Sequence, residues 1–536
     1  MSVNDFTVKV DRKTTPAEFN FSPTFNVAVP FIDRHLQQQN GSRIAIQTKT
    51  TDVTYQELAD QVNRCGNMFL EKRIVPTERV MMVVKDTPAF IYLFWGAIKA
   101  GIVPVPANTL LRHEDYAFMI DKTQCKALCY SPEYRAEIEA ALEVASHQPE
   151  VILEEGVSAS GTHSLERQLT AYSAKLLPYP ASAETDCFWL FSSGSTGRPK
   201  AAVHRHRDMV VTSELYGVGC LNISEKDIFY SAAKLFFAYG LGNAMTLPLW
   251  VGGTIVLDHR KPTPQTTFDN IAEYKPTLYF GVPTLYASLL SHFDELLPKP
   301  SLASVRACVS AGEALPADIL RRWQERFDID ILDGIGSTEA LHIFITNRLN
   351  NTIPGASGRV VPGYTARILD ENDQVLGHGE TGRLVIKGPS IARCYWDDSE
   401  QTSRIMRGEW LETGDTYVKD DDDVFTYCGR TDDMMKVGGI WCSPFEIEAK
   451  LISHPAVLES AVIAKTDQAG LVKPAAFIVL NNPGEGDEAL KEKLTTYLRK
   501  NLAPYKFPRW IEFVDELPKT ATGKIQRFRL RTHEKI

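Results

Sequence analysis

The chain has 536 residues, of which 44% are hydrophobic and 23% are charged. This length exceeds what one hydrophobic core usually serves, so two or more domains are expected, and the composition is that of a globular protein. The net charge of −9 argues against a general nucleic-acid-binding surface, although a small basic pocket remains compatible with it.

The nine cysteines are odd in number and scattered along the chain, which favours a reduced, cytoplasmic protein over a disulfide scaffold. Cys125 and Cys129 have no second pair or histidine nearby, so we expect no zinc site. Residues 1–13 lack the apolar segment of a signal peptide. The longest apolar stretch, residues 235–253, contains Asn243, Pro248 and several glycines, so it is interpreted as core and pocket wall and not as a membrane span.

Strand and helix patterns alternate through the N-terminal part. After an extended arm up to residue 25, we expect a helix at 25–37 and a strand at 44–48. Thr54 followed by Glu57 has the spacing of a capping box at a helix start. A strand at 79–84, a helix at 88–100 and a strand at 101–105 then form a βαβ unit, which predicts a mostly parallel sheet with helices on both faces.

The alternation resumes after residue 205, where Asp208 could cap a helix over 209–216. Short strands with Gly, Pro and Asp turns predict a β-rich subdomain from residue 355 to about 427. In the last hundred residues, strand and helix patterns alternate again. Predicted strands are 253–257, 277–281, 305–310, 329–334, 434–437, 460–465, 475–480 and 510–514, and predicted helices are 264–274, 283–293, 316–327, 443–452 and 487–502.

The predicted fold class is therefore α/β, and α+β in part. A large N-terminal domain (1–430) of parallel-sheet αβαβα layers includes the β subdomain (355–430), and residues 431–433 form a hinge. A smaller mobile α+β domain (434–536) follows.

One stretch combines glycines, hydroxyls and a lysine between two strands, at 188–191 and 201–203. Glycine lets backbone N–H groups approach a ligand, and successive inward N–H groups bind anions, so a polyphosphate is the ligand that suits this loop. A Walker A loop is excluded because Pro199 separates Gly197 from Lys200. A polar surface turn is the alternative. The stretch consists of Ser192, Ser193, Gly194, Ser195, Thr196, Gly197, Arg198, Pro199 and Lys200.

A second motif, residues 334–339, follows the predicted strand 329–334, and strand ends are where α/β sheets place ligands. A carboxylate beside a phosphate loop suits Mg²⁺, which binds one carboxylate together with phosphate oxygens, so Glu339 is the candidate metal ligand. The alternative is that Thr338 and Glu339 simply cap a helix.

The phosphate loop resembles that of the adenylate-forming superfamily, which comprises acyl- and aryl-CoA synthetases, adenylation domains and beetle luciferases. The later motifs follow in the family's order over nearly the whole chain. Residues 188–206 and 234–242 are most similar to the benzoate–CoA ligase branch, although Arg198, Ala201 and Arg205 depart from its usual pattern.

The resemblance implies a nucleotide site in which Asp415 binds both ribose hydroxyls and Arg430 helps to hold the ribose. A carboxylate suits this role because it accepts two hydrogen bonds at once; the alternative is a salt bridge at a domain edge. The implied ATP- and AMP-binding residues are Ser192, Ser193, Gly194, Ser195, Thr196, Gly197, Lys200, Gly312, Glu313, Asp333, Gly334, Ile335, Thr338, Asp415 and Arg430.

The resemblance assigns catalysis to Lys524, Thr338 and Glu339. Lys524, in the motif 518–527, would neutralise charge while a carboxylate attacks the α-phosphorus of ATP; the alternative is a solvated lysine of the C-terminal tail. Thr338 would contact a phosphate or the acyl carboxylate.

The resemblance also implies an acid pocket with room for one aromatic ring, and a hinge and loop that line a CoA tunnel. Aromatic residues and Trp441 could instead belong to the core. The pocket residues are Phe236, Ala238, Tyr239, Ala311, Gly312, Ile335 and His342, and the tunnel and hinge residues are Asp432, Lys436, Gly438, Gly439 and Trp441.

The predicted activity is that of an ATP- and Mg²⁺-dependent aryl acid–CoA ligase, acting on benzoate or a substituted benzoate in a monomer or homodimer. One alternative is a free-standing adenylation enzyme that loads a carrier-protein thiol. A non-catalytic nucleotide-binding regulator is another, although the joint presence of Lys524, Glu339 and Asp415 argues against it. A luciferase-type oxygenase remains compatible with the motifs.

Overall fold

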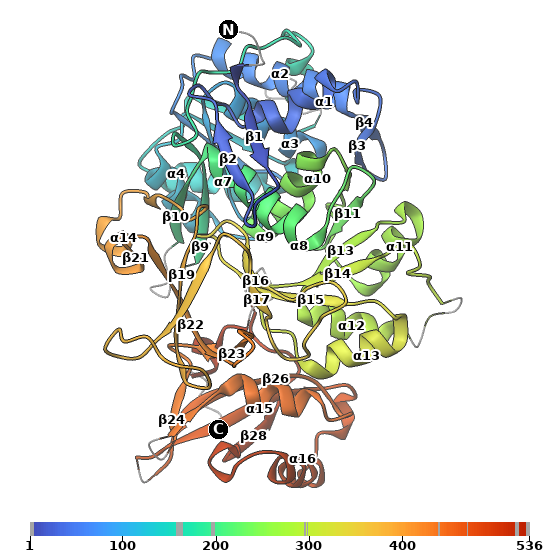
Figure 1. The fold of residues 1–536 in the computed structure, drawn as a ribbon, viewed down its shortest axis with the longest axis vertical. Coiled ribbons are helices and arrows are strands. Elements are labelled where there is room, and N and C mark those ends of the chain that lie inside the picture. The colour runs from blue at the N-terminus through green and yellow to red at the C-terminus, as the bar shows by residue number, and fades with distance from the viewer. Residues whose placement is uncertain are drawn as a thin grey trace.

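The computed structural model describes residues 5–156, 165–193, 199–293, 296, 299–437, 440–468, 470–519 and 525–531. A large N-terminal domain built on several sheets occupies most of the molecule, and a smaller domain formed by the C-terminal part lies at one end of the long axis (Figure 1). The predicted α/β class is confirmed, since parallel strands alternate with helices through the large domain.

A nine-stranded sheet forms the centre of the large domain, and its inner strands run parallel. Alternate residues of these strands enter two different cores: Tyr279 and Cys308 face one, and Phe280 and Val309 face the other. The sheet is therefore covered on both faces, as the βαβ rhythm predicts. In spatial order its strands are β17 (Arg359–Val360), β16 (Ile343–Thr346), β15 (Ile331–Gly336), β14 (Ala307–Ser310), β13 (Leu278–Gly281), β11 (Ile228–Ser231), β12 (Thr254–Val256), β3 (Ile44–Gln47) and β4 (Asp52–Thr54).

Helices α11 (Pro264–Tyr274), α12 (Pro283–Phe293) and α13 (Ala317–Phe327) cover one face of this sheet. The other face packs against α7 (His206–Thr212), the π-helical segment (Ser213–Val218) that continues α7, and the β subdomain. α8 (Gly219–Leu221) ends the helical run that begins with α7, and a second run after β11 comprises α9 (Ala238–Leu241), a π-helical segment (Gly242–Thr246) and α10 (Leu247–Val251).

A second, wholly parallel sheet has the order β6 (Val103–Pro106), β5 (Arg79–Val83), β7 (Ala127–Tyr130) and β8 (Val151–Glu154). Helices α2 (Tyr55–Glu71) and α3 (Pro88–Lys99) pack on one face, and α4 (His113–Thr123) and α5 (Arg135–Val144) on the other. Shorter elements in this half are β1 (Val8–Asp11), β2 (Glu18–Phe21), α1 (Arg34–Gln37) and α6 (Leu165–Leu169).

Two antiparallel sheets, besides the antiparallel pair of β1 and β2, complete the large domain. One joins β9 (Asp186–Ser193), β10 (Pro199–Arg205) and β20 (Cys394–Tyr395); the other is the predicted β-rich region. The latter contains β18 (Thr365–Leu369), β19 (Thr381–Lys387), β21 (Met406–Arg407), β22 (Trp410–Lys419) and β23 (Phe425–Arg430), with α14 (Ser399–Ile405) beside it.

The small domain has its own hydrophobic core between a three-stranded sheet and two helices. Its strands are β26 (Val457–Thr466), β27 (Val472–Leu480) and β28 (Trp510–Phe513), with the hairpin β24 (Met435–Val437) and β25 (Ile440–Cys442). Its helices are α15 (Pro444–Ile452), α16 (Glu488–Asn501) and the short α17 (Arg527–Arg531).

Local signals predicted several boundaries well. The capping box at Thr54 is confirmed, because its hydroxyl accepts from the Glu57 amide and its amide donates to the Glu57 carboxylate at 2.8 Å. The helix expected at 25–37 was too long: a π-helical turn (Val29–Asp33) precedes the four residues of α1. Asp208 is the third residue of α7 and not its cap, since the helix begins at His206.

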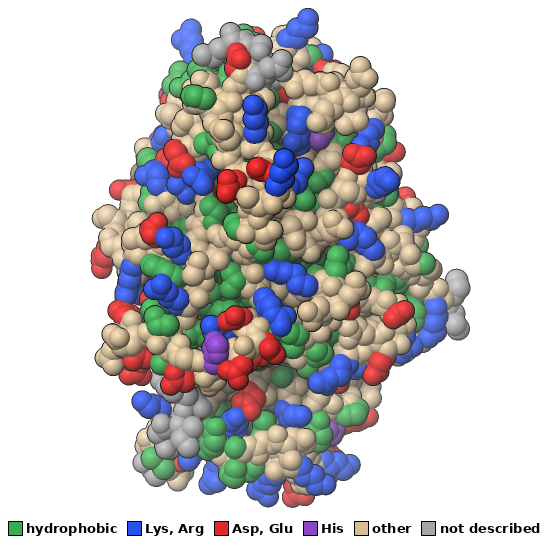
Figure 2. Space-filling model, viewed as in Figure 1, with side chains coloured by type: hydrophobic (Ala, Val, Ile, Leu, Met, Phe, Trp, Pro, Cys, Tyr) green, Lys and Arg blue, Asp and Glu red, His purple; other side chains and the backbone are tan. Residues whose placement is uncertain are grey.

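Within the described residues, no helix is long and apolar enough to cross a membrane. Acidic and basic side chains are interspersed over the face of the molecule shown in Figure 2.

Candidate active site

The predicted phosphate loop joins the two strands of a β-hairpin, and its first and last residues belong to these strands. Strands β9 and β10 pair antiparallel, with Ser192 opposite Lys200 and Ser193 opposite Pro199. The two strands predicted beside the loop are therefore direct neighbours in one sheet. The loop residues Gly194, Ser195, Thr196 and Gly197 lie outside the described residues, and Ser193 is described for its backbone only.

Glu339 lies beside this hairpin, 147 residues further along the chain than Ser192. The Ser192 hydroxyl donates to Oε1 of Glu339 at 2.9 Å, and the Tyr395 hydroxyl donates to the same oxygen at 2.7 Å. Burial and the negative charge of Glu339 raise the pKa of Tyr395 well above its usual range, so this hydroxyl stays protonated and remains a donor. Two donors thus fix one oxygen of the carboxylate.

Lys200 lies close to Tyr395, the residue that donates to Glu339, with its Nζ 5.7 Å from the centre of the Tyr395 ring. Burial and the nearby Arg404 lower the pKa of Lys200, while Glu339 and Asp398 act in the opposite direction. A lysine, a serine and a carboxylate from two distant motifs therefore meet at the base of the hairpin.

The backbone of the second motif is held by a buried histidine. His204 Nε2 lies 2.8 Å from the carbonyl oxygen of Thr338, and its Nδ1 lies 3.1 Å from the Asp208 carboxylate. The His204 ring stacks on Phe188, with 5.1 Å between ring centres. Strand β10 and the start of α7 thereby position Thr338 and Glu339 against the hairpin.

The residues expected around adenine lie just after β14 and within β15. Asp333 and Gly334 are buried, and burial raises the pKa of the Asp333 carboxyl to about 8. Gly312 has φ +97°, a conformation that favours glycine, and begins the turn that carries Glu313. Ile335 is the partly buried residue that follows in β15.

The residues expected around ribose face each other across two strands. Asp415 in β22 is opposite Arg430 in β23, and Arg430 Nη1 donates to Asp415 Oδ1 at 2.9 Å. The salt bridge that the sequence left as an alternative is therefore present. It does not exclude the ribose role, because this bond uses only Oδ1 of the carboxylate.

The expected acid pocket brings together Tyr239 in α9 and His342. Their ring centres are 6.1 Å apart, and His342 is also 4.8 Å from Tyr216. His342 Nε2 lies 3.1 Å from Asn243 Oδ1, and burial lowers the pKa of His342 to about 3, so the imidazole is neutral. A Cβ added to Gly242 would lie 2.2 Å from the His342 ring, so this position must be glycine for the ring to fit.

The remaining pocket residues, Phe236, Ala238 and Ala311, are buried. Sequence reasoning missed four residues of these sites: Tyr216, Asn243, His204 and Tyr395. No local pattern marks Tyr395, since it reaches the hairpin through the pairing of β20 with β10.

The expected hinge and tunnel residues lie where the chain passes from the large domain into the small one. Lys436 pairs with Trp441 across β24 and β25, and Trp441 is described for its backbone only. Arg531 Nη2 donates to the backbone oxygen of Asp432 at 3.4 Å. Gly438, Gly439 and Lys524 lie outside the described residues.

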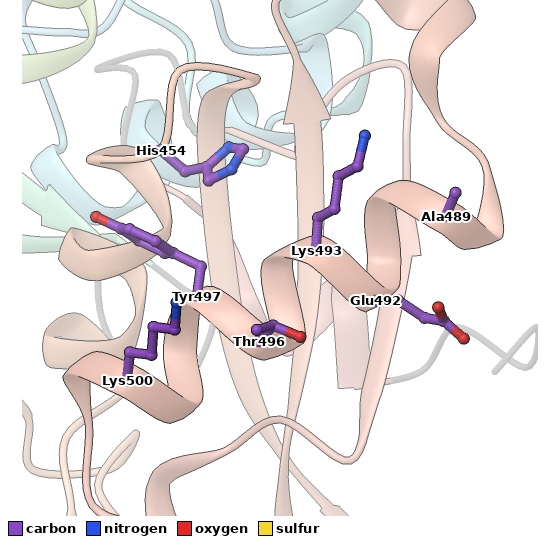
Figure 3. A pocket seen from close by; sticks show the side chains of 7 residues that line it. All are labelled: His454, Ala489, Glu492, Lys493, Thr496, Tyr497 and Lys500. Atoms are coloured by element: carbon purple, nitrogen blue, oxygen red, sulfur yellow. The ribbon is translucent and has the colours of Figure 1, made fainter.

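A groove of about 540 Å³ lies elsewhere, on the surface of the small domain (Figure 3). It is formed by α16 and by His454, whose ring centre is 5.2 Å from that of Tyr497. None of the predicted site residues lines it, so we do not assign the chemistry to it. Its lining residues are His454, Ala489, Glu492, Lys493, Thr496, Tyr497 and Lys500.

Two family patterns match the chain. Residues 32–396 match the AMP-binding enzyme family, and residues 446–524 match the AMP-binding enzyme C-terminal domain.

Curated relatives cover nearly the whole chain. A benzoate–CoA ligase of Thauera aromatica is 46% identical over 97% of this chain and 98% of its own length. A 4-hydroxybenzoate–CoA/benzoate–CoA ligase of Rhodopseudomonas palustris is 42% identical over 95% of this chain and 94% of its own.

Solved structures of similar enzymes also cover nearly the whole chain. An anthranilate CoA ligase, AuaEII, in complex with anthranoyl-AMP matches with a TM-score of 0.91 and 36% identity, covering 99% of this chain and 98% of that one. A benzoate CoA ligase from Burkholderia xenovorans LB400 matches with a TM-score of 0.87 and 41% identity, covering 95% and 100%. The chain therefore belongs to the AMP-binding enzyme family, the adenylate-forming enzymes that its sequence motifs predict.

Proposed function

We propose that this protein is an AMP-forming aryl acid–CoA ligase that converts benzoate, or a benzoate with one small substituent, to its CoA thioester. The observation that carries the proposal is the meeting of Ser192, Lys200 and Glu339 at the base of the phosphate hairpin, in a chain 46% identical to a benzoate–CoA ligase. These groups can bind a polyphosphate and a cation, as adenylation requires.

In the first half-reaction, an oxygen of the acid's carboxylate attacks the α-phosphorus of ATP, and the bond to pyrophosphate breaks to give aryl-AMP. Two anions must approach each other, so positive charge that bridges them stabilises the transition state. Lys200 supplies such charge at the hairpin, and Lys524 is proposed to supply it at the α-phosphate.

Glu339 fits Mg²⁺, because a fixed carboxylate together with the phosphate oxygens of the substrate is the donor set that this cation uses. No cluster of three or more His, Cys, Asp or Glu side chains suited to a metal occurs among the described residues. Mg²⁺ would neutralise charge on the phosphates.

In the second half-reaction, the CoA sulfur attacks the aryl-AMP carbonyl, the bond to AMP breaks, and the thioester forms. We propose that the small domain turns about residues 431–433 between the two steps, so that the Gly438–Gly439 loop lines the CoA tunnel. The proposed domains are residues 1–430, including the subdomain 355–430, and residues 434–536.

The acid pocket is proposed to accept one ring between Tyr239 and His342. The Tyr239 hydroxyl donates to the backbone oxygens of Gly281 and Val309, at 3.2 and 3.1 Å, so this side chain is fixed and does not yield to a larger ligand. Relatives that are named for hydroxybenzoates and anthranilate indicate that ring substituents vary within the family.

All nine cysteines are free in the structure, which supports the cytoplasm as the proposed compartment. The oligomeric state, a monomer or a homodimer, stays a prediction.

The test is CoA consumption with benzoate, its hydroxy and amino derivatives, a cinnamate and a medium-chain fatty acid, each with ATP and Mg²⁺. We expect benzoate or one monosubstituted benzoate to give the highest kcat/KM. The alternative is transfer to a carrier protein, and p-hydroxybenzoic acid–AMP ligases are 31% identical over 89% of this chain. Aryl-AMP formation without CoA consumption would favour that alternative.

A further inference from the structure

A hydrogen bond joins the two domains at the residue that follows the predicted catalytic lysine in the chain. The backbone amide of Ile525 donates to Oε1 of Glu313 at 3.0 Å, across 212 residues of sequence. Glu313 lies in the turn after β14 of the large domain, and Ile525 is the residue that follows Lys524 in the chain. Both residues are partly buried.

Ile525 is rigidly attached to the small domain. It forms a bridge with Lys519, and the amide of Gln526 donates to the Pro518 carbonyl at 2.7 Å. Two residues on, Arg527 Nη2 donates to both oxygens of the buried Glu448, at 2.8 and 2.7 Å. These contacts tie Ile525 to the small domain, so its bond to Glu313 links the two domains.

The same segment reaches the hinge. Arg527 Nη1 lies 3.8 Å from Oδ2 of Asp433. Arg531 donates to the Asp433 carboxylate and to the backbone oxygen of Asp432. Residues 525–531 thus connect the Glu313 turn of the large domain to the predicted hinge, and a hydrogen bond at Ile525 is coupled to the orientation of the small domain.

A second contact between the domains is apolar. Ile452 at the end of α15 packs against the large-domain core that includes α13. Apolar burial is not directional, so it tolerates small rotations. A carboxylate that accepts an amide requires a defined distance and angle, so the Glu313 contact specifies one orientation.

We propose that Glu313 is a positioning residue for the first half-reaction, which latches the small domain in the orientation that presents Lys524 to the nucleotide. The proposal rests on the proposed ligase function. A partly exposed carboxylate suits a reversible latch, because water can replace each partner when the domain turns for the second half-reaction.

The experiment measures the two half-reactions separately in the full chain. ATP–pyrophosphate exchange with benzoate reports adenylation, and benzoyl-CoA formation from supplied benzoyl-AMP reports thioester formation. Glu313→Ala removes the acceptor, and Glu313→Gln keeps a neutral one. Glu325→Gln, at an exposed carboxylate of α13, is the matched control.

We expect Glu313→Ala to lower the exchange kcat by about 10- to 100-fold, the scale of a lost hydrogen bond to a charged group. Glu313→Gln should lower the exchange kcat several-fold less than Glu313→Ala, and in both variants the rate of benzoyl-CoA formation from benzoyl-AMP should fall much less than the exchange kcat. The control should match wild type in both assays.

Equal losses in both half-reactions would overturn the proposal, since they would mean that Glu313 only lines the nucleotide site or supports the fold. A raised KM for ATP with unchanged kcat would overturn it too. A failure of the proposed function is distinguishable, because the wild-type protein would then consume CoA with none of the acids.

Discussion

The hydroxyl of Tyr395 donates to Oε1 of Glu339 at 2.7 Å, across 56 residues of sequence, and so orients the candidate metal ligand. Partners that orient a metal-binding group commonly contribute 10- to 100-fold to metal affinity. This contact leads to the first of five predictions.

Tyr395→Phe should raise the Mg²⁺ concentration for half-maximal adenylation by about tenfold, because it removes one of the two donors to Glu339 among the described residues. The measurement is ATP–pyrophosphate exchange against Mg²⁺ concentration. Tyr417→Phe is the control, since its buried hydroxyl bonds Ser357 Oγ at 3.0 Å in the β subdomain. A shift of the same size in both variants would contradict the orienting role of Tyr395.

Lys524→Ala should lower the adenylation rate by on the order of 10²- to 10³-fold, the scale of losing one preorganised electrostatic stabiliser. It should leave thioester formation from supplied aryl-AMP nearly unchanged, because no bond to phosphorus forms or breaks in that step. Single-turnover measurements of each half-reaction provide the check. Equal losses in the two steps would show that the assigned role is wrong.

Gly439→Leu should block thioester formation and spare adenylation, because a bulky side chain would fill the CoA tunnel that this loop is predicted to line. Asp432→Pro should hold the small domain in one orientation, since proline fixes φ and restricts the residue before it. Both variants are checked by the same half-reaction assays. Loss of adenylation alone in Gly439→Leu would count against the predicted domain rotation.

His342→Ala should change the ranking of substituted benzoates more than the apparent affinity for ATP. An extra methylene and an unmade hydrogen bond to a buried substituent each change discrimination by about 1–3 kcal/mol, so a change in the pocket wall reorders the substituted benzoates. Hexanoate and longer acids should be poor substrates. His454→Ala, in the groove on the small domain, is the control. Better use of octanoate than of every benzoate would refute the predicted pocket.

Asp333 should make the folded large domain less stable as pH rises from about 4 to 8. Burial raises its folded pKa to about 8, whereas the unfolded value is about 3.9, so in this range the unfolded chain binds fewer protons than the native one. The contribution of Asp333 to the free energy of unfolding falls by up to about 1.4 kcal/mol per pH unit.

Asp333→Asn should remove this slope, so the variant should gain thermal stability relative to wild type between pH 5 and pH 7.5. The check is the Tm of ligand-free protein at several pH values. Glu143→Gln, at an exposed carboxylate of α5, should run parallel to wild type. A difference between Asp333→Asn and wild type that is constant with pH would refute the assignment.

Much of this protein is determined by short stretches of its sequence. The capping box at Thr54 and the bounds of α11 follow from residues that are neighbours in the chain, because caps and apolar periodicity act within a few positions. The glycines, hydroxyls and lysine of residues 192–200 likewise predict a phosphate loop without knowledge of the fold.

Only the tertiary structure decided which distant groups meet. Tyr395 reaches Glu339 because β20 pairs with β10, His204 holds Thr338 from a different strand, and Ile525 meets Glu313 because the small domain docks on the large one. Such contacts depend on strand pairing and domain packing between segments that are tens to hundreds of residues apart, and no local pattern of residue types encodes them.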